Sequence, residues 1–183
     1  MADDARDPAL ERLDAFIGTW HLDAVFPHSP PSDEGDDEVA SATFEWTLDG
    51  RYLVQRTNAP RPAPDSLAVV NFDPAHHTFT QHYFDSRGVV RVYVMTFDGQ
   101  LWTLLRDAPD FSPLDFSQRF VGTFSHDGNR IVGRWEISED GVHWEHDFDL
   151  TYSKVSGSKV SGSKVSGSKV SGSKVSGWEV TSS

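Results

Sequence analysis

The segment VHWEHDFDLTY, residues 142–152, places a histidine where it could do chemistry. Side chains of a strand point alternately to its two faces, so His146 shares a face with Trp144 and Phe148, whereas the opposite face is acidic and polar. An imidazole on an apolar face can anchor a ligand, act as an axial metal ligand or carry a proton. A core histidine bonded to a neighbour is the alternative interpretation.

The other histidines do not suggest a metal site. His76 and His77 fall in a predicted turn, and His82 lies several residues into the next predicted strand. His143 points to the opposite face from His146, so three ligands do not converge in this pattern and we expect no bound metal. The chain has no cysteine, which excludes disulfides and thiolate metal sites. No Ser-His-Asp constellation or glycine-rich phosphate loop is readable.

These residues lie in a series of predicted strands. Apolar and polar residues alternate with period two in about ten segments, which predicts an all-β fold. The segments are residues 19–26, 39–48, 51–57, 66–72, 78–84, 89–97, 100–106, 116–124, 130–137 and 142–152. One short helix precedes them, because Asp7 can cap it, Pro8 suits its first position and Gly18 ends it. Its apolar stripe consists of Leu10, Leu13 and Ile17.

The lengths of the connections predict how the strands are wired. Joins after even-numbered strands are tight, as in LDGR (48–51) and FDGQ (97–100), where Asp-Gly favours a hairpin. Joins after odd-numbered strands are mostly long, as in residues 27–38, 58–65 and 107–115. In an up-and-down meander, even and odd joins gather at opposite ends. We therefore expect an up-and-down antiparallel β-barrel, plugged by the helix at its tight-turn end and open at the other.

The faces predicted to point inward combine apolar side chains with a few polar ones. The sixth strand is ambiguous, because the residues that face in could be either Val90, Val92 and Val94 or Arg91, Tyr93 and Met95. Ten strands leave room for a ligand, and an apolar cavity with sparse polar groups is typical of a small-molecule site. An interior filled by aromatic rings is the alternative. The candidate ligand-binding residues are His146, Trp144, Phe148, Trp135, Gln118, Phe120, Tyr83, Gln81, Arg91 and Trp46.

Four motifs relate the chain to a known family: FIGTW (16–20), FEWTLDGRYLVQRT (44–57), VVNFDPAHHTFTQHYFD (69–85) and GRWEISEDGVHWEHDFDLTY (133–152). With these motifs the chain resembles the lipocalin-like (calycin) superfamily, and within it a bacterial lipocalin-like family of uncharacterised function. The resemblance covers most of residues 10–152. It implies the barrel fold. It implies no particular reaction, because that family has no established one.

A weaker likeness is to nitrobindins, ten-stranded barrels that hold haem through a histidine near the C-terminus. By this resemblance His146 would be the axial ligand. The glycine-rich opening of that family, G-x-W-x-G-x-G, is not kept, because residues 21–24 (HLDA) stand where the glycines would fall. We therefore expect no cofactor, with haem at His146 as the alternative.

Charge is distributed unevenly along the chain. Residues 1–152 contain 11 arginines and 27 acidic residues, a net charge of −16, whereas the remainder has five lysines and one glutamate. A domain this acidic repels phosphate backbones, so we expect no nucleic-acid partner. The acidic residues expected around the open end are those of segment 32–38 with Asp65, Asp107, Asp110 and Asp115. They would form either a solvated rim or a negative collar that disfavours anionic ligands.

The end of the chain differs from the rest. Residues 153–177 are five copies of SKVSG, and WEVTSS (178–183) follows. The period matches neither a helix nor a strand, so we expect a flexible linker outside a barrel domain of residues 1–152. Natural expansion and engineered insertion both explain exact copies. Because the acidic N-terminus lacks an apolar core and no stretch approaches ~18 apolar residues, we predict a cytoplasmic protein without membrane contact.

Three binding or catalytic functions are compatible with this sequence, besides a filled barrel used only for contacts or as a carrier for the repeat. The leading hypothesis is a non-enzymatic barrel that binds a small, largely apolar, neutral or cationic molecule. The second is a barrel enzyme of the isomerase or cyclase type, with His146 as acid or base and Tyr83 or Arg91 orienting the substrate. The third is haem binding through His146.

Overall fold

The computed structural model describes residues 6–27 and 39–155, which form two short helical turns followed by ten strands. The elements are α1 (Pro8–Arg12), the 3₁₀ helix η1 (Leu13–Phe16), β1 (Gly18–Val25), β2 (Ser41–Thr47), β3 (Tyr52–Asn58), β4 (Ser66–Asp73), β5 (Thr78–Asp85), β6 (Val90–Phe97), β7 (Leu101–Arg106), β8 (Ser117–Phe124), β9 (Arg130–Ser138) and β10 (Glu145–Lys154). The last strand begins later than predicted and also ends later. The other strands start and stop close to their predicted bounds.

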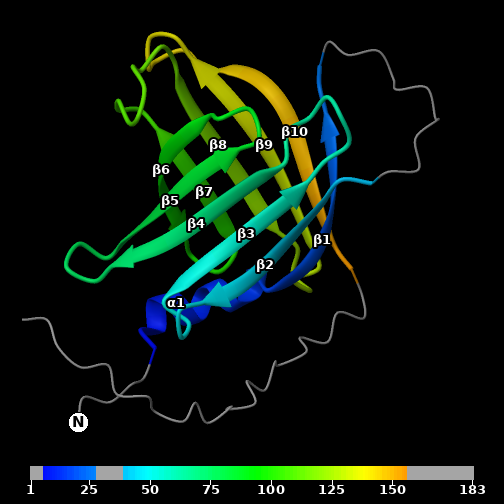
Figure 1. Cartoon of the computed structure of the whole chain (residues 1–183), viewed down its shortest axis with the longest axis vertical. Coiled ribbons are helices and arrows are strands. Elements are labelled where there is room, and N and C mark those ends of the chain that lie inside the picture. Colours follow the sequence, from blue (N-terminus) through cyan, green and yellow to red (C-terminus); the bar gives the residue numbers. More distant parts are fainter. Residues whose placement is uncertain (1–5, 28–38, 156–183) are drawn as a thin grey trace, which may run out of the picture.

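The ten strands form a closed antiparallel barrel (Figure 1). Each strand pairs with its neighbours in the sequence, and β1 pairs with β10 to close the ring. In that closing pair Trp20 lies opposite Lys154 and Val25 lies opposite Asp149. The predicted up-and-down barrel is confirmed, and closure leaves its sheet without open edges.

The segment before β1 plugs one end of this barrel. Figure 1 shows α1 across the end where the short β2–β3 turn lies. The side chain of Asp7 caps the helix by accepting a hydrogen bond from the backbone N–H of Ala9 (2.8 Å). Because α1 tightens into a 3₁₀ helix of three residues per turn, the apolar stripe continues at Phe16. Ile17, the third residue of the predicted stripe, is partly buried and packs against the core.

Phe16 fills the plugged end. Its side chain is fully buried. Four rings surround it at centroid distances of 4.9–5.4 Å: Phe44, Phe97, Trp102 and Phe124. The carbonyl of Phe16 also accepts a hydrogen bond from the indole Nε1 of Trp20 on β1 (2.7 Å). The helix thus joins the barrel wall through both packing and a buried hydrogen bond.

The first residues of the SKVSG repeat belong to the barrel. β10 runs to Lys154, and the N–H of Val155 donates to the carbonyl of Thr19 (2.8 Å). The Lys154 ammonium lies 4.9 Å from the ring centroid of Trp20 and donates to the carbonyl of Ala15 (3.3 Å). The repeat from residue 156 onward, and its predicted flexibility, lie outside the described residues.

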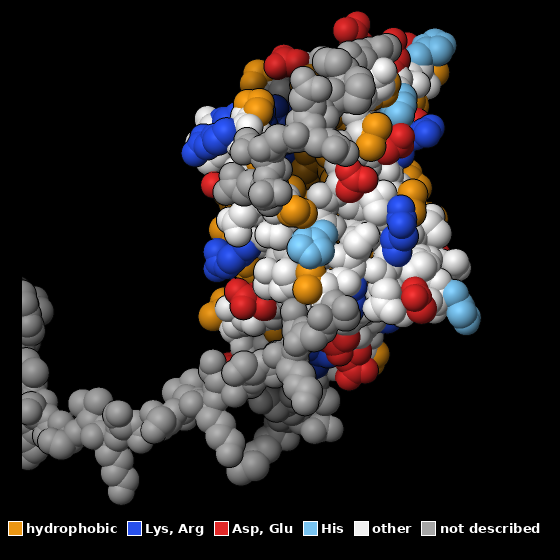
Figure 2. Space-filling model, turned by 90° about the vertical axis from the view of Figure 1, so that its right-hand side faces the viewer, with side chains coloured by type: hydrophobic (Ala, Val, Ile, Leu, Met, Phe, Trp, Pro, Cys, Tyr) orange, Lys and Arg blue, Asp and Glu red, His pale blue; other side chains and the backbone are white. Residues whose placement is uncertain are grey.

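The outer face of the barrel is mixed in character. Figure 2 shows acidic, basic and histidine side chains interspersed with scattered hydrophobic ones on the side that lies to the right in Figure 1. None of the described helices is both long enough and apolar enough to cross a membrane.

Replacing the plug side chain tests its contribution to stability. Phe16→Ala is expected to lower the free energy of unfolding by about 3–5 kcal/mol, because it removes a buried ring and leaves a cavity among its aromatic neighbours. Urea unfolding followed by tryptophan fluorescence measures the change. Phe111→Ala is the control: this ring is 73% exposed, and a change within about 0.5 kcal/mol is expected. Equal effects of the two substitutions would contradict the role given to Phe16.

Candidate functional site

A cavity of about 770 Å³ lies inside the barrel, toward the end away from the helix. Side chains from strands all around the ring contribute to its walls. Its rim includes Pro60, Pro64, Val89 and Phe116, which belong to the joins after odd-numbered strands. The barrel is therefore accessible at the predicted end, and its interior is not filled by aromatic rings.

One wall of the cavity is apolar. β1 contributes Leu22 and β10 contributes Leu150, and three aromatic rings continue this wall. Phe26 stacks on Phe148 with ring centroids 4.9 Å apart, and Phe148 stacks on Trp135 at 6.3 Å. This row of rings offers a flat surface for an apolar ligand.

The facing wall, formed by β5, β6 and β8, is polar. Gln81 and Tyr83 come from β5, Arg91 and Tyr93 from β6, and Gln118 from β8. The Tyr93 hydroxyl donates to Oε1 of Gln118 (2.8 Å). Gln81 is only 5% exposed, yet its amide has no hydrogen-bond partner among the described residues. The Gln81 amide therefore has unused hydrogen-bonding groups that face the cavity. Arg91 and Tyr93 also line the cavity, which resolves the ambiguity of the sixth strand.

Tyr83 serves this wall as a hydrogen-bond donor. Its hydroxyl donates to the carboxylate of Asp85 (3.3 Å). Burial, assisted by the negative charge of Asp85, raises the pKa of Tyr83 to about 12. Burial also raises the pKa of Tyr93 and of Tyr152. These phenols stay protonated at neutral pH, so they can orient a ligand but do not act as bases there.

Six of the predicted site residues line the cavity: Phe148, Trp135, Gln118, Tyr83, Gln81 and Arg91. They come from β5, β6, β8, β9 and β10, and strand alternation alone brought each of them to the inner face.

The prediction that His146 faces the cavity was wrong. The pairing of β10 with β9 shifts between His146 and Phe148, so one extra residue is inserted at this point. The alternation assumed from the sequence breaks there, and His146 lies on the outer side, with Nε2 3.1 Å from Oδ1 of Asp149. Among the described residues that line the cavity there is no histidine. Neither an axial haem ligand nor an acid–base role inside the barrel fits His146.

The same bulge turns Asp147 toward the cavity, which the sequence analysis missed. Burial raises the pKa of this carboxyl group, and the nearby charge of His146 opposes the shift. Asp147 has no hydrogen-bond partner among the described residues. Strict alternation had assigned Asp147 to the wet face, and no local sequence signal marks the bulge.

Three other predicted residues also lie outside the cavity lining. Trp144 packs beneath the guanidinium of Arg119, 4.2 Å from the ring centroid, on the outer face of the barrel. Trp46 reaches the plugged end, where its Nε1 donates to Asp14 (2.6 Å). Phe120 is fully buried in the core.

Phe120 is held there by two glycines on neighbouring strands. A Cβ at Gly133 would lie 2.3 Å from the Phe120 ring, and one at Gly122 would lie 2.7 Å away. The ring therefore occupies the space that side chains at these positions would take. Phe120 therefore points inward as expected, but its ring packs against its own wall and does not line the cavity.

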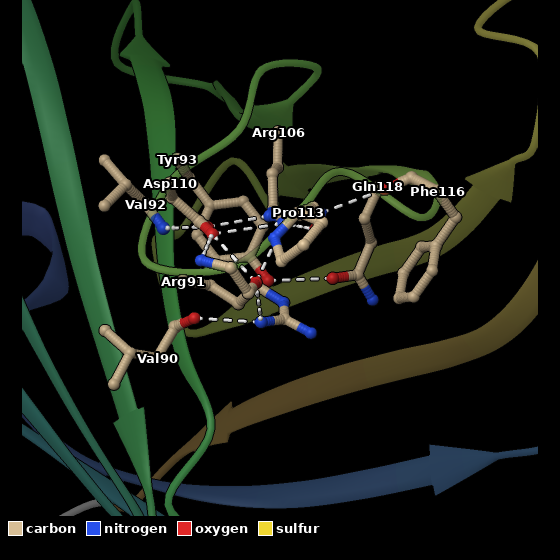
Figure 3. A network of polar contacts seen from close by, with 10 residues as sticks. Val90, Arg91, Val92, Tyr93, Arg106, Asp110, Pro113, Phe116 and Gln118 are labelled. Atoms are coloured by element: carbon tan, nitrogen blue, oxygen red, sulfur yellow. Dashed lines mark hydrogen bonds and ion pairs between the residues drawn. The ribbon is translucent and has the colours of Figure 1, made fainter.

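The loop between β7 and β8 is fastened at the mouth by a buried ion pair (Figure 3). The Arg106 guanidinium donates to both carboxylate oxygens of Asp110, at 2.7 and 3.1 Å. Their side chains are 1% and 3% exposed. Arg106 also donates to the carbonyls of Phe116 (3.0 Å) and Pro113 (3.3 Å). This network holds the loop against the barrel where the chain enters β8.

Asp110 therefore does not belong to an exposed collar. Besides the two Arg106 contacts, its oxygens accept hydrogen bonds from the N–H groups of Val92 and Ser112 (both 3.1 Å) and from the Ser112 hydroxyl (3.1 Å). The hydrogen bond from Arg106 is the main reason that the pKa of Asp110 is strongly lowered. Asp107 and Asp115 are exposed, and segment 32–38 lies outside the described residues. The prediction that Asp110 would rim the mouth as an exposed charge was wrong.

Among residues 6–27 and 39–155, no three His, Asp or Glu side chains are grouped closely enough to hold a metal ion. No protein-family model matches the sequence, and no curated protein matches it.

The buried ion pair gives a pH-dependent prediction. Asp110→Asn should lower the free energy of unfolding at pH 7 by about 3–5 kcal/mol, because it leaves the Arg106 charge buried without its partner. Since the folded-state pKa of Asp110 is depressed, its contribution is present above its unfolded pKa of about 4 and is lost as the pH falls through the folded value. The difference between the variant and the natural protein should therefore shrink below about pH 4.

Urea unfolding at a series of pH values measures this difference. Asp149→Asn is the matched control, because its partner Arg134 is 55% exposed and the expected change is within about 1 kcal/mol. A difference for Asp110→Asn that is independent of pH would contradict the assignment.

Proposed function

We propose that this protein binds a small, largely apolar molecule inside its barrel, in the manner of lipocalin-like proteins. The observation that carries the proposal is the cavity of about 770 Å³ at the accessible end of a closed barrel. Small-molecule sites typically measure about 300–1,000 Å³ and combine apolar walls with a few polar groups. The cavity has both properties.

The two walls support complementary roles in binding. The β1 and β10 side supplies apolar contact, and buried apolar area is worth about 25 cal/mol per Å². On the facing side, Gln81 and Gln118 keep amide groups available for orienting a ligand. Such sparse polar groups give direction and specificity rather than most of the affinity.

A binding role is favoured over the isomerase or cyclase hypothesis, because the base that hypothesis required, His146, lies outside the cavity. The same placement removes the reason for proposing haem. We also propose membership of the bacterial lipocalin-like family, supported by the four motifs that coincide with β1–β5, β9 and β10.

We also propose the cytoplasm as the place of this binding, with which a chain that forms no disulfide is compatible. The acidity of residues 1–152 supports a small molecule rather than a nucleic acid as the partner.

Filling the cavity tests the proposal. Leu150→Trp should weaken binding of the neutral dye N-phenyl-1-naphthylamine by about tenfold or more, because the larger side chain occupies cavity space and removes over 1.4 kcal/mol of binding free energy. Dye fluorescence titration gives the dissociation constant, and circular dichroism verifies the fold.

Two controls place the effect inside the barrel. Val132→Trp adds the same ring on the outer face of β9, where Val132 is 53% exposed, and should leave the affinity unchanged. His146→Ala should also leave it unchanged. The proposal fails if the natural protein binds no dye, or if the two tryptophan variants bind it equally well.

A further inference from the structure

The charge of the ligand can be inferred from the charged side chains of the cavity, given the binding function proposed above. Among the described residues, three charged side chains line the cavity: Arg87, Arg91 and Asp147. Arg87 is neutralised, because its Nη2 donates to the carboxylate of Asp85 at 2.7 Å and its Nε to the same oxygen at 3.1 Å. Arg91 and Asp147 form no ion pair among the described residues, although the charge of His146 lies near Asp147.

Arg91 is held in place by uncharged groups. Its Nη1 donates to the carbonyl of Val90 (2.9 Å) and to the hydroxyl of Ser112 (3.1 Å). Its Nε and Nη2 have no partner among the described residues. One edge of the guanidinium is therefore fixed, and the other edge keeps its donors free.

The carboxylate in the same network cannot neutralise Arg91. Asp110 already accepts two hydrogen bonds from Arg106, two from backbone N–H groups and one from Ser112. Those contacts use both of its oxygens. The network thus positions Arg91 through Ser112 while leaving its charge uncompensated.

Gln118 adds a second free donor beside Arg91. Figure 3 shows the Arg91 guanidinium and the Gln118 amide on the same side of the Arg106–Asp110 pair. The amide oxygen of Gln118 accepts the Tyr93 hydroxyl (2.8 Å), so its NH₂ group remains to donate. A planar group with two acceptor oxygens matches the free edge of a guanidinium and a neighbouring amide N–H.

The row of aromatic rings in the cavity ends near Arg91 and Gln118. Phe26, Phe148 and Trp135 stack in succession, and Trp135 packs edge-to-face against Tyr93 with centroids 5.7 Å apart. The Tyr93 hydroxyl in turn binds Gln118. A flat apolar surface therefore ends at the unpaired donors.

We propose that the cavity selects aromatic carboxylates, whose carboxylate group is bound by Arg91 and Gln118 and whose ring system lies along Phe148 and Trp135. This is opposite to the neutral or cationic ligand expected from the acidic mouth. The acidic surface does not oppose it strongly, since exposed charges beyond about 8 Å are screened at physiological salt. The competing feature is Asp147, which would favour a ligand with an ammonium group.

Three probes with one ring system separate these possibilities: 2-naphthoate, 2-naphthalenemethanol and 2-naphthylmethylamine. Isothermal titration calorimetry of the full chain at pH 7.5 gives their dissociation constants. We expect 2-naphthoate to bind about tenfold or more tightly than the alcohol, because hydrogen bonds to a charged group are the stronger kind. Arg91→Gln should remove this preference, so that the acid and the alcohol then bind with similar affinity.

Two further variants refine the test. Arg91→Lys should restore only part of the preference, because an ammonium lacks the planar fork of a guanidinium. Arg134→Gln, which removes an arginine from the outer face of β9, should retain the full preference. Circular dichroism verifies that Arg91→Gln has folded.

Other outcomes overturn the inference. If the acid and the alcohol bind equally, or if the amine binds most tightly and Asp147→Asn abolishes that advantage, the cavity does not select carboxylates, although the proposed binding function stands. If neither the naphthyl probes nor N-phenyl-1-naphthylamine binds, the binding function fails with it.

Discussion

Closure of the sheet between β1 and β10 is the constraint on which the rest of this structure depends. A sheet of ten strands encloses more space than its own side chains need to fill. At one end that space is taken by Phe16 and the four rings around it, which the preceding helix inserts into the barrel. At the other end no such element of residues 6–27 and 39–155 enters, and the cavity remains. The rings that stabilise the barrel and the residues proposed to bind a ligand thus lie at opposite ends of the same interior.

The mouth illustrates how a stabilising network can also prepare a binding group. Arg106 and Asp110 are paired so completely that the loop after β7 is fixed against the barrel. Because Asp110 is saturated, Arg91 is bound through Ser112 and has no carboxylate partner among the described residues. A charge that is held in place but not neutralised costs free energy unless water or a ligand compensates it. This is the physical reason for looking to the ligand for the missing partner.

Most of the barrel could be predicted from the sequence, and six of the ten candidate site residues line the cavity, although the inward face of the strand with Arg91 was left open. Gln81, Tyr83 and Gln118 were placed correctly because period-two alternation is a local property of each strand. His146 was misplaced because a single inserted residue reverses the faces on one side of the bulge. Phe120 faces inward as predicted, but Gly122 and Gly133 let its ring pack against the wall instead of the cavity.

By itself, the sequence determined the strands, their up-and-down order, the position of the plug and the end that stays accessible. Each of these follows from alternation, turn residues and loop length, which are read within short stretches of chain. Only the tertiary structure decided that Asp147 and not His146 lines the cavity, that Asp110 is ion-paired with Arg106, and that Arg91 keeps free hydrogen-bond donors. These outcomes depend on pairing register and on contacts between different strands and loops, and a one-dimensional pattern does not contain those distances.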